Sequence, residues 1–429
     1  MGGGLMQLVA YGAQDIYLTG NPQITFFKVV YRRHTNFSME AIQQTFNGSV
    51  GTNASTVTAT ISRNGDLVSN LWLDIKLRST GATAAGGTYM NWTNNTGHAF
   101  IKDCEIEIGG QRIDRHYSQW LDVYNELTDH EEQEWIGLNK HSAKNAYLKS
   151  QSTVAANGAN MDNTRLYVPL KFWFCRNPGL ALPLIALQYH EVKFKLTTRK
   201  IDSLVNSSAT LSGVSADPSV ELYADYIYLD TDERRRFAQV SHEYLIEQIQ
   251  RETGTAPTSQ TLNFNHPVKE LIWVFQHTSA ATESSTTNID ATLNIDGTVA
   301  THGNDYFCYA NANSQNNEVI NGSSQNEGFI DMKLQLNGHD RFSKRKATYF
   351  RTCQPIQAGH KVPSKHIYCY SFALKPEEHQ PSGTCNFSRI DNAAMLFTGT
   401  TTDTTLTVYA VNYNVLRIMS GMGGLAYSN

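Results

Sequence analysis

The sequence has no uninterrupted apolar run approaching the ~20 residues that a membrane-spanning helix needs. Its opening, Met1 to Met6, has neither the basic nor the apolar region of a secretory signal peptide. Cysteine is sparse, and no two cysteines form a short CxxC pair. We therefore expect a soluble, cytosolic chain with reduced and mostly buried cysteines (Cys104, Cys175, Cys308, Cys353, Cys369 and Cys385).

Charged side chains are also scarce. Lys, Arg, Asp and Glu together make up 17% of the residues, where about 25% is usual. The formal net charge of −4 gives no positive field that would attract a nucleic-acid backbone. Direct nucleic-acid binding is thereby disfavoured. Tyr, Phe, Ser, Thr and Asn are plentiful instead, which favours β-sandwiches over helical bundles.

The motifs of common enzymes are missing too. The sequence contains no Walker loop, dinucleotide fingerprint, HExxH or GxSxG. Cys353, His360, His366 and Cys369 lie near one another along the chain, but their spacings do not match the short ligand pairs of structural zinc sites. We predict no catalytic residue, no metal site and no cofactor.

Three short polar segments are weaker candidates for chemistry. His190-Glu191 and His242-Glu243 each place their two side chains on opposite faces of a strand, so we expect solvated groups or cross-strand partners. The run Arg234-Arg235-Arg236 is suited to phosphate or to an acidic neighbour, although a solvated helix face is the interpretation we favour.

What the sequence does contain is one pattern twice. Residues 105–112 (EIEIGGQR) return as residues 333–341 (KLQLNGHDR), and in both copies alternating apolar residues lead to a glycine-containing pair typical of a hairpin. Upstream, residues 71–75 (LWLDI) have a counterpart in residues 271–275 (LIWVF). A chain of 429 residues is long enough for two domains of about 200 residues each. The sequence therefore predicts two related β-domains in tandem.

The remaining patterns set the predicted boundaries. We expect an N-terminal arm at 1–26, a first sandwich at 27–230, a linker helix at 231–242 and a second sandwich at 243–429. Apolar residues at helical spacing predict one clear helix from Arg115 to Trp135. Residues 278–328 are rich in Ser, Thr, Asn, Ala and Gly, which indicates a long surface loop.

Several segments resemble one known family. The opening run 8–28 (LVAYGAQDIYLTGNPQITFFK) is similar to the start of the major capsid proteins of nucleocytoplasmic large DNA viruses, especially those of chloroviruses and other alga-infecting relatives. The resemblance spans the chain and both termini, and it continues at residues 61–67, 108–114, 178–192, 380–392 and 413–427.

The resemblance implies an all-β fold of two tandem antiparallel eight-stranded jelly rolls with short helical insertions. It also implies a structural protein without catalytic activity, whose homotrimers form pseudo-hexagonal capsomers in the icosahedral shell of a large double-stranded DNA virus. The expected place is the virion capsid, assembled in the host cytoplasm. The expected partners are neighbouring capsomers, minor capsid and penton proteins, and an inner membrane layer reached by the arm and by tail residues 421–429.

In relatives of this kind, outward loops carry N-glycans at unusual sequons. The resemblance thus makes Asn288, Asn313 and Asn321 candidate glycosylation sites on the outward loop 278–328, whereas Asn386 lies in a strand-like segment and is expected to be unmodified.

Three alternatives stay open. The chain could be a minor capsid paralogue. It could also be a carbohydrate-binding or host-attachment module, since jelly rolls also serve lectins. Such a module needs exposed aromatic side chains, and the loop offers only Tyr306, Phe307 and Tyr309. An enzyme of the cupin type would need His and Glu ligands clustered on one sheet, and none occurs at suitable spacing.

Overall fold

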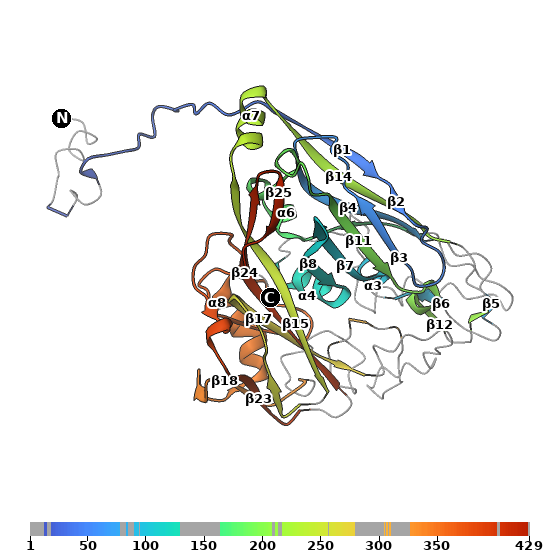
Figure 1. Ribbon diagram of the computed structural model, residues 1–429. Helices are drawn as coiled ribbons and strands as arrows, with labels where there is room; N and C mark the ends of the chain where they lie inside the picture. The colour runs from blue at the N-terminus through green and yellow to red at the C-terminus, as the bar shows by residue number, and fades with distance from the viewer. Residues whose placement is uncertain are drawn as a thin grey trace, which may run out of the picture. The chain divides into compact units, whose positions relative to one another are not determined.

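The protein is described here by a computed structural model (Figure 1). Residues 1–36 and 37–429 form two separate compact units. The larger unit contains two halves, each built from two antiparallel sheets. The described residues are 13–14, 19–77, 83–84, 90–93, 95–128, 164–207, 211–212, 217–255, 257–278, 304, 306–307, 309, 327–400 and 404–427.

Two sheets make the first half. The first sheet has the order β1-β14-β4-β10, with β9 also paired to β4; the second has the order β2-β3-β11-β7-β8. The bounds are β1 (Phe37–Gln44), β2 (Phe46–Asn47), β3 (Thr56–Thr60), β4 (Leu67–Leu77), β7 (Ile101–Ile108), β8 (Gln111–Tyr117), β9 (Thr164–Pro169), β10 (Leu182–Pro183), β11 (Val192–Thr198) and β14 (Ser219–Leu229). Two short ribbons pair β6 (Met90–Trp92) with β12 (Val205–Ser207), and β5 (Thr83–Ala84) with β13 (Leu211–Ser212).

The second half repeats this order. Its first sheet runs β15-β24-β17-β21, with β22 on β17 and β25 on β24; its second runs β16-β23-β18-β19, with β20 on β18. The bounds are β15 (His242–Thr255), β16 (Ser259–Thr261), β17 (Pro267–His277), β18 (Asp331–Leu336), β19 (His339–Asp340), β20 (Arg345–Lys346), β21 (Ile367–Ser371), β22 (Cys385–Asn386), β23 (Ala393–Thr398), β24 (Thr404–Met419) and β25 (Met422–Leu425).

The repeat seen in the sequence is confirmed in detail. Gly109-Gly110 joins β7 to β8 and Asn337-Gly338 joins β18 to β19, and all four residues have positive φ, as a type I′ hairpin turn requires. Strands β4 and β17 are both 11 residues long and share a bulge at their third residue, Ser69 in one and Lys269 in the other. The fold is the predicted pair of tandem jelly rolls.

Helices occupy the connections. The helix predicted from Arg115 begins later, as α4 (Ser118–Thr128), because Arg115 to Tyr117 still pair with β7. The linker helix is α7 (Thr231–Gln239), capped by the Asp230 carboxylate, which accepts a hydrogen bond from the Thr231 amide at 2.8 Å. The others are α3 (Thr96–Phe100), α6 (Trp173–Arg176), a π-helical turn (Tyr349–Cys353) and α8 (Gln354–Ala358), with 3₁₀ turns at 178–180, 184–186, 201–204 and 387–389. No described helix has the length and apolarity to cross a membrane.

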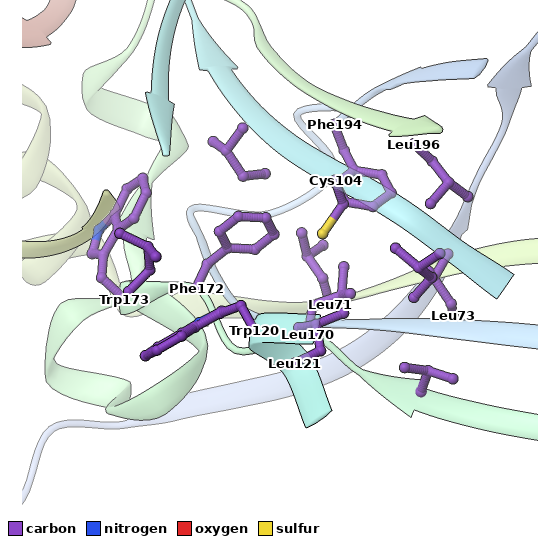
Figure 2. Close-up of a cluster of buried hydrophobic side chains, with 14 of the residues drawn as sticks. Leu71, Leu73, Cys104, Trp120, Leu121, Leu170, Phe172, Trp173, Phe194 and Leu196 are labelled. Atoms are coloured by element: carbon purple, nitrogen blue, oxygen red, sulfur yellow. The ribbon is translucent and has the colours of Figure 1, made fainter. Parts of the chain in front are cut away.

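Two apolar cores hold the larger unit together. One fills the second half around Trp273 and Phe350. The other fills the first half and extends across the junction to Ile272, Val274 and Tyr409. Figure 2 shows part of it, where side chains of β4, β7 and β11 meet those of α4 and α6. One of the two cores is therefore shared between the halves, and the face of the second half's first sheet that points away from its own core is covered by the first half.

Candidate assembly surfaces

Helix α4 is the centre of the junction between the halves. Its Asp122 carboxylate is buried and accepts hydrogen bonds from the Lys365 ammonium at 2.7 Å and from the Tyr309 hydroxyl at 2.8 Å. Its Gln119 accepts a hydrogen bond from the Tyr409 hydroxyl at 2.9 Å, and the Trp120 ring lies 5.3 Å from the Tyr409 ring. A helix of one half is thus seated on the outer face of a sheet of the other.

A buried ion network lies beside this contact. Arg176 of the first half donates to the Glu247 carboxylate at 2.5 Å, and the Lys269 ammonium lies 2.8 Å from the same carboxylate. Arg176 and Glu247 border a hollow of about 190 Å³ that Glu377 also lines. Removing one member would leave the others charged and buried, so the network ties β15 to α6.

Next to it, His360 bridges two glutamates. Its Nε2 lies 2.8 Å from Glu270 and its Nδ1 lies 2.6 Å from Glu377. Burial alone would disfavour the imidazolium, but the charge of Glu270 and the hydrogen bonds of both carboxylates raise the pKa of His360 to about 9. Burial opposes the Glu270 carboxylate as well, yet the attraction of His360 lowers its pKa. Both groups are therefore charged at neutral pH, which makes this a structural ion cluster.

The residues considered for zinc do not form a site. Cys353 is exposed, Cys369 is buried on β21, and His366 is buried with its pKa lowered by desolvation. Within the described parts of the chain, no group of three or more His, Cys, Asp or Glu side chains is arranged to hold a metal ion.

The other polar candidates have structural partners. Glu243 pairs across the sheet with Arg417 at 2.9 Å, as a cross-strand partner should. The His190 ring lies 2.9 Å from the carbonyl oxygen of Gly423 and so ties the first half to β25. In the basic run, Arg234 binds the buried Asp66 carboxylate at 2.9 Å and still keeps its side chain 53% exposed. No residue of α7 is buried, so the run forms the favoured solvated helix face, with Asp66 as an acidic neighbour of one arginine.

The carbohydrate-binding alternative needs exposed aromatic side chains, and the three that the loop offers are buried. Tyr306, Phe307 and Tyr309 are all at most 4% exposed. Tyr306 donates its hydroxyl hydrogen to the Ser203 carbonyl at 2.8 Å, so this part of segment 278–328 is anchored in the first half. Sequence composition hid the anchor because three aromatics are few among the surrounding polar residues.

The candidate glycosylation sites Asn288, Asn313 and Asn321 lie outside the described residues. Asn386 is exposed at the end of β22, where its side chain accepts a hydrogen bond from the Ser388 amide at 3.1 Å.

The outer face of the first half's first sheet, in contrast, is left open by the described residues. A hollow of about 560 Å³ lies on it, lined by Ala41, Trp72, Asp74, Arg165, Tyr167, Tyr223 and Asp225. Asp74 is buried at the floor and accepts a hydrogen bond from the Arg165 guanidinium at 3.0 Å. Three aromatic side chains beside an ion pair are typical of a protein contact surface.

The separate N-terminal unit exposes apolar side chains as well. Phe26 is 91% and Phe27 is 97% exposed, and Lys28, Arg32 and Arg33 accompany them. Exposed apolar groups of this size indicate a segment that contacts another surface.

Together, two jelly rolls with a shared core, buried ion clusters between the halves, and a hollow and an apolar segment suited to protein contacts are the features of a structural protein that assembles. Comparison with known proteins names the family. A family model described as "Major capsid protein N-terminus" matches residues 25–230, and one described as "Large eukaryotic DNA virus major capsid protein" matches residues 233–424. The chain belongs to this family of major capsid proteins.

Relatives agree over their whole length. The chain is 50% identical to the major capsid protein of Pyramimonas orientalis virus and 45% identical to that of Paramecium bursaria Chlorella virus 1, with all of both chains covered in each case. Among solved structures, VP54 of PBCV-1 superposes with a TM-score of 0.72 at 39% identity, covering 94% of this chain and all of that one. The Faustovirus major capsid protein shares the fold, with a TM-score of 0.71 at 13% identity over 95% of this chain and 94% of that one. The chain is thus a structural protein of the virus capsid.

The sequence missed the junction residues. One signal was available: Lys269-Glu270 interrupts the otherwise apolar strand β17, and a charged pair inside a buried strand indicates a buried ion network. The pairing of Asp122 with Lys365 carried no such signal, because the two residues lie 243 positions apart.

Proposed function

We propose that the chain assembles as a homotrimer whose six sandwiches form a pseudo-hexagonal capsomer, and that these capsomers tile the icosahedral shell of a large double-stranded DNA virus. The observation that best supports this is the duplication: both halves have the same sheet order and the same bulge, so one chain supplies two similar units. A threefold ring of such chains approximates sixfold symmetry and packs in flat layers.

The same proposal assigns the remaining partners. The arm 1–26, ahead of the jelly rolls at 27–230 and 243–429, contacts minor capsid and penton proteins or the inner membrane layer. Its apolar side chains suit an apolar protein groove, and the basic residues Lys28, Arg32 and Arg33 that follow the arm suit an anionic lipid surface. Assembly takes place in the host cytoplasm, and Asn288, Asn313 and Asn321 carry glycans on the outward side.

A host-attachment module is the second candidate considered, and the structure favours it less. It needs exposed aromatic side chains, and the three that the loop offers are buried.

Light scattering on the purified protein, with intact-mass spectrometry of the same sample, tests the proposal. The expected mass is about 144 kDa, three times the 47.9 kDa of one chain. Additional mass in hexose-sized steps supports glycosylation. A monodisperse monomer at high protein concentration would contradict the capsomer.

A further inference from the structure

The two halves use the same surface in different ways. Trp72 lies three residues past the bulge of β4, and Ile272 lies three residues past the bulge of β17. On the neighbouring strands, Tyr223 pairs with Trp72 as Tyr409 pairs with Ile272. The outer faces of the two sheets are therefore equivalent position by position.

In the second half this face is covered. Ile272 and Tyr409 belong to the core shared between the halves, and Tyr409 contacts Gln119 and Trp120 of α4. In the first half the equivalent pair, Trp72 and Tyr223, lines the open hollow of about 560 Å³. The outer face of the second half's sheet is thus covered within the chain. The equivalent face of the first half's sheet lacks a partner among the described residues.

The equivalent cations show the same difference. Strand β9 pairs with β4, and β21 pairs with β17. When the pairing of β21 is extended by two residues, Lys365 occupies the position that Arg165 has in the first half. Lys365 reaches across the junction to Asp122, whereas Arg165 pairs with Asp74 on its own sheet and remains 51% exposed.

The helical surface that covers such a sheet face also occurs in both halves, and the copy in the second half is exposed. Helix α4 follows the β7-β8 hairpin and precedes β9; the π-helical turn and α8 follow the β18-β19 hairpin and precede β21. Figure 1 shows α8 on the side of the second half that faces away from α4. It shows the sheet of β1, β14 and β4 at the end of the first half that lies away from the second half. On α8, Ile356 is 65% exposed and Gln357 and Cys353 are exposed beside it.

We propose that the hollow on the outer face of β4, β9 and β14 receives the α8 side of the second half of a neighbouring copy, with Ile356 entering between Trp72 and Tyr223. This assignment rests on the proposed trimer and names its intersubunit contact. The contact is heterologous, and repeating it three times closes a ring in which intrachain and interchain junctions alternate.

Charge and size agree with this occupant. The segment before α8 carries exposed Lys344, Arg345 and Lys346, and the hollow presents the Asp225 carboxylate. A hollow of about 560 Å³ holds several side chains, so Ile356 would enter with its helical neighbours. The apolar area of one isoleucine is too small to hold a trimer alone, and the flanking contacts complete the interface.

Disulfide trapping tests the proposal in the full-length chain. The double variant Ala41→Cys/Ile356→Cys, made with Cys353→Ser, should give covalent dimers and trimers under mild oxidation. The matched control replaces the first change by Lys193→Cys, on β11 of the other sheet, with its side chain 42% exposed; it should stay uncrosslinked.

A second variant asks whether the contact matters. Ile356→Asp should shift the solution mass from trimer to monomer while the circular dichroism spectrum is kept. Val240→Asp, which changes a 53% exposed side chain at the end of α7, should remain trimeric.

The outcomes separate the two proposals. A trimer with crosslinks at the 41–356 pair supports both. A trimer that shows no crosslink above the Lys193 control, and that tolerates Ile356→Asp, overturns the assigned contact and leaves the capsomer standing. A monomeric wild-type chain overturns the capsomer and this contact together.

Discussion

The bulge of β4 and the bulge of β17 show how two halves with one fold diverge. At the same bulge position the first half has Ser69, whose hydroxyl donates to the Asp225 carbonyl, and the second half has Lys269, whose buried ammonium reaches Glu247 and the Pro376 carbonyl at 2.6 Å. The neutral residue at the first bulge therefore forms a side-chain hydrogen bond within its own sheet. The charged bulge joins a network that includes Arg176 of the other half. The two halves share one scaffold, and the buried charge at this bulge lies where the two halves meet.

The largest expected effect comes from removing the carboxylate of Glu247, which both cations of the junction network share. Glu247→Gln removes the carboxylate that Arg176 and Lys269 share, and we expect a loss of about 3–5 kcal/mol in the free energy of unfolding, measured by urea denaturation. The control is Glu243→Gln on the same strand, whose surface pair with Arg417 should contribute less than about 1 kcal/mol. Equal effects of the two changes would mean that the network adds nothing to the junction.

A pH titration sharpens the same difference. The pKa of His360 is raised in the folded state to about 9 from a usual 6.5. Its contribution is therefore fully present below pH 6.5 and is lost as the pH rises through about 9, a change of about 3 kcal/mol. The lowered pKa of Glu270 adds stability above its usual value, and this is lost as the pH falls toward acid. Thermal unfolding measured from pH 6 to 10 should show the alkaline loss.

The His360→Gln variant provides the control for that titration. It should be less stable than the wild type at pH 6.5 and should lose most of the alkaline slope. A wild-type protein whose melting temperature is flat between pH 6.5 and 9 would show that His360 is not charged in the folded state.

The smallest expected effect tests whether the equivalent hairpin turns of the two halves contribute equally to stability. Gly110 and Gly338 have φ of +82° and +81°, and a Cβ added at either would have no neighbour within 4 Å. Gly110→Ala and Gly338→Ala should therefore each cost about 1 kcal/mol for the backbone alone. Clearly unequal melting temperatures of the two variants would argue that the turns are not equivalent.

Local patterns carried most of the fold. The EIEIGGQR and KLQLNGHDR segments specify hairpins through residues that lie next to one another, and alternating apolar residues specify which face of each strand is buried. The helix boundary at Arg115 failed by three residues because pairing with Asp103 to Glu105 keeps the chain extended to Tyr117. Strand pairing is a long-range effect that no helical spacing reveals.

The assembly surfaces were harder to predict from the sequence. Asp122 and Lys365 look like ordinary surface charges in the sequence, and only the packing of α4 on the second half makes them a buried pair. The anchor formed by Tyr306 and Tyr309 was hidden for the same reason: its partners Ser203 and Asp122 lie about 100 and 190 residues away in the sequence.

A cryo-EM reconstruction of the assembled protein, at a resolution that separates the two halves of each chain, tests the central claim most directly. The account predicts three copies around a threefold axis, with the hollow at Trp72 and Tyr223 of each copy covered by the α8 side of the next. A ring in which first halves contact only first halves, or in which the hollow stays open to solvent, would contradict it.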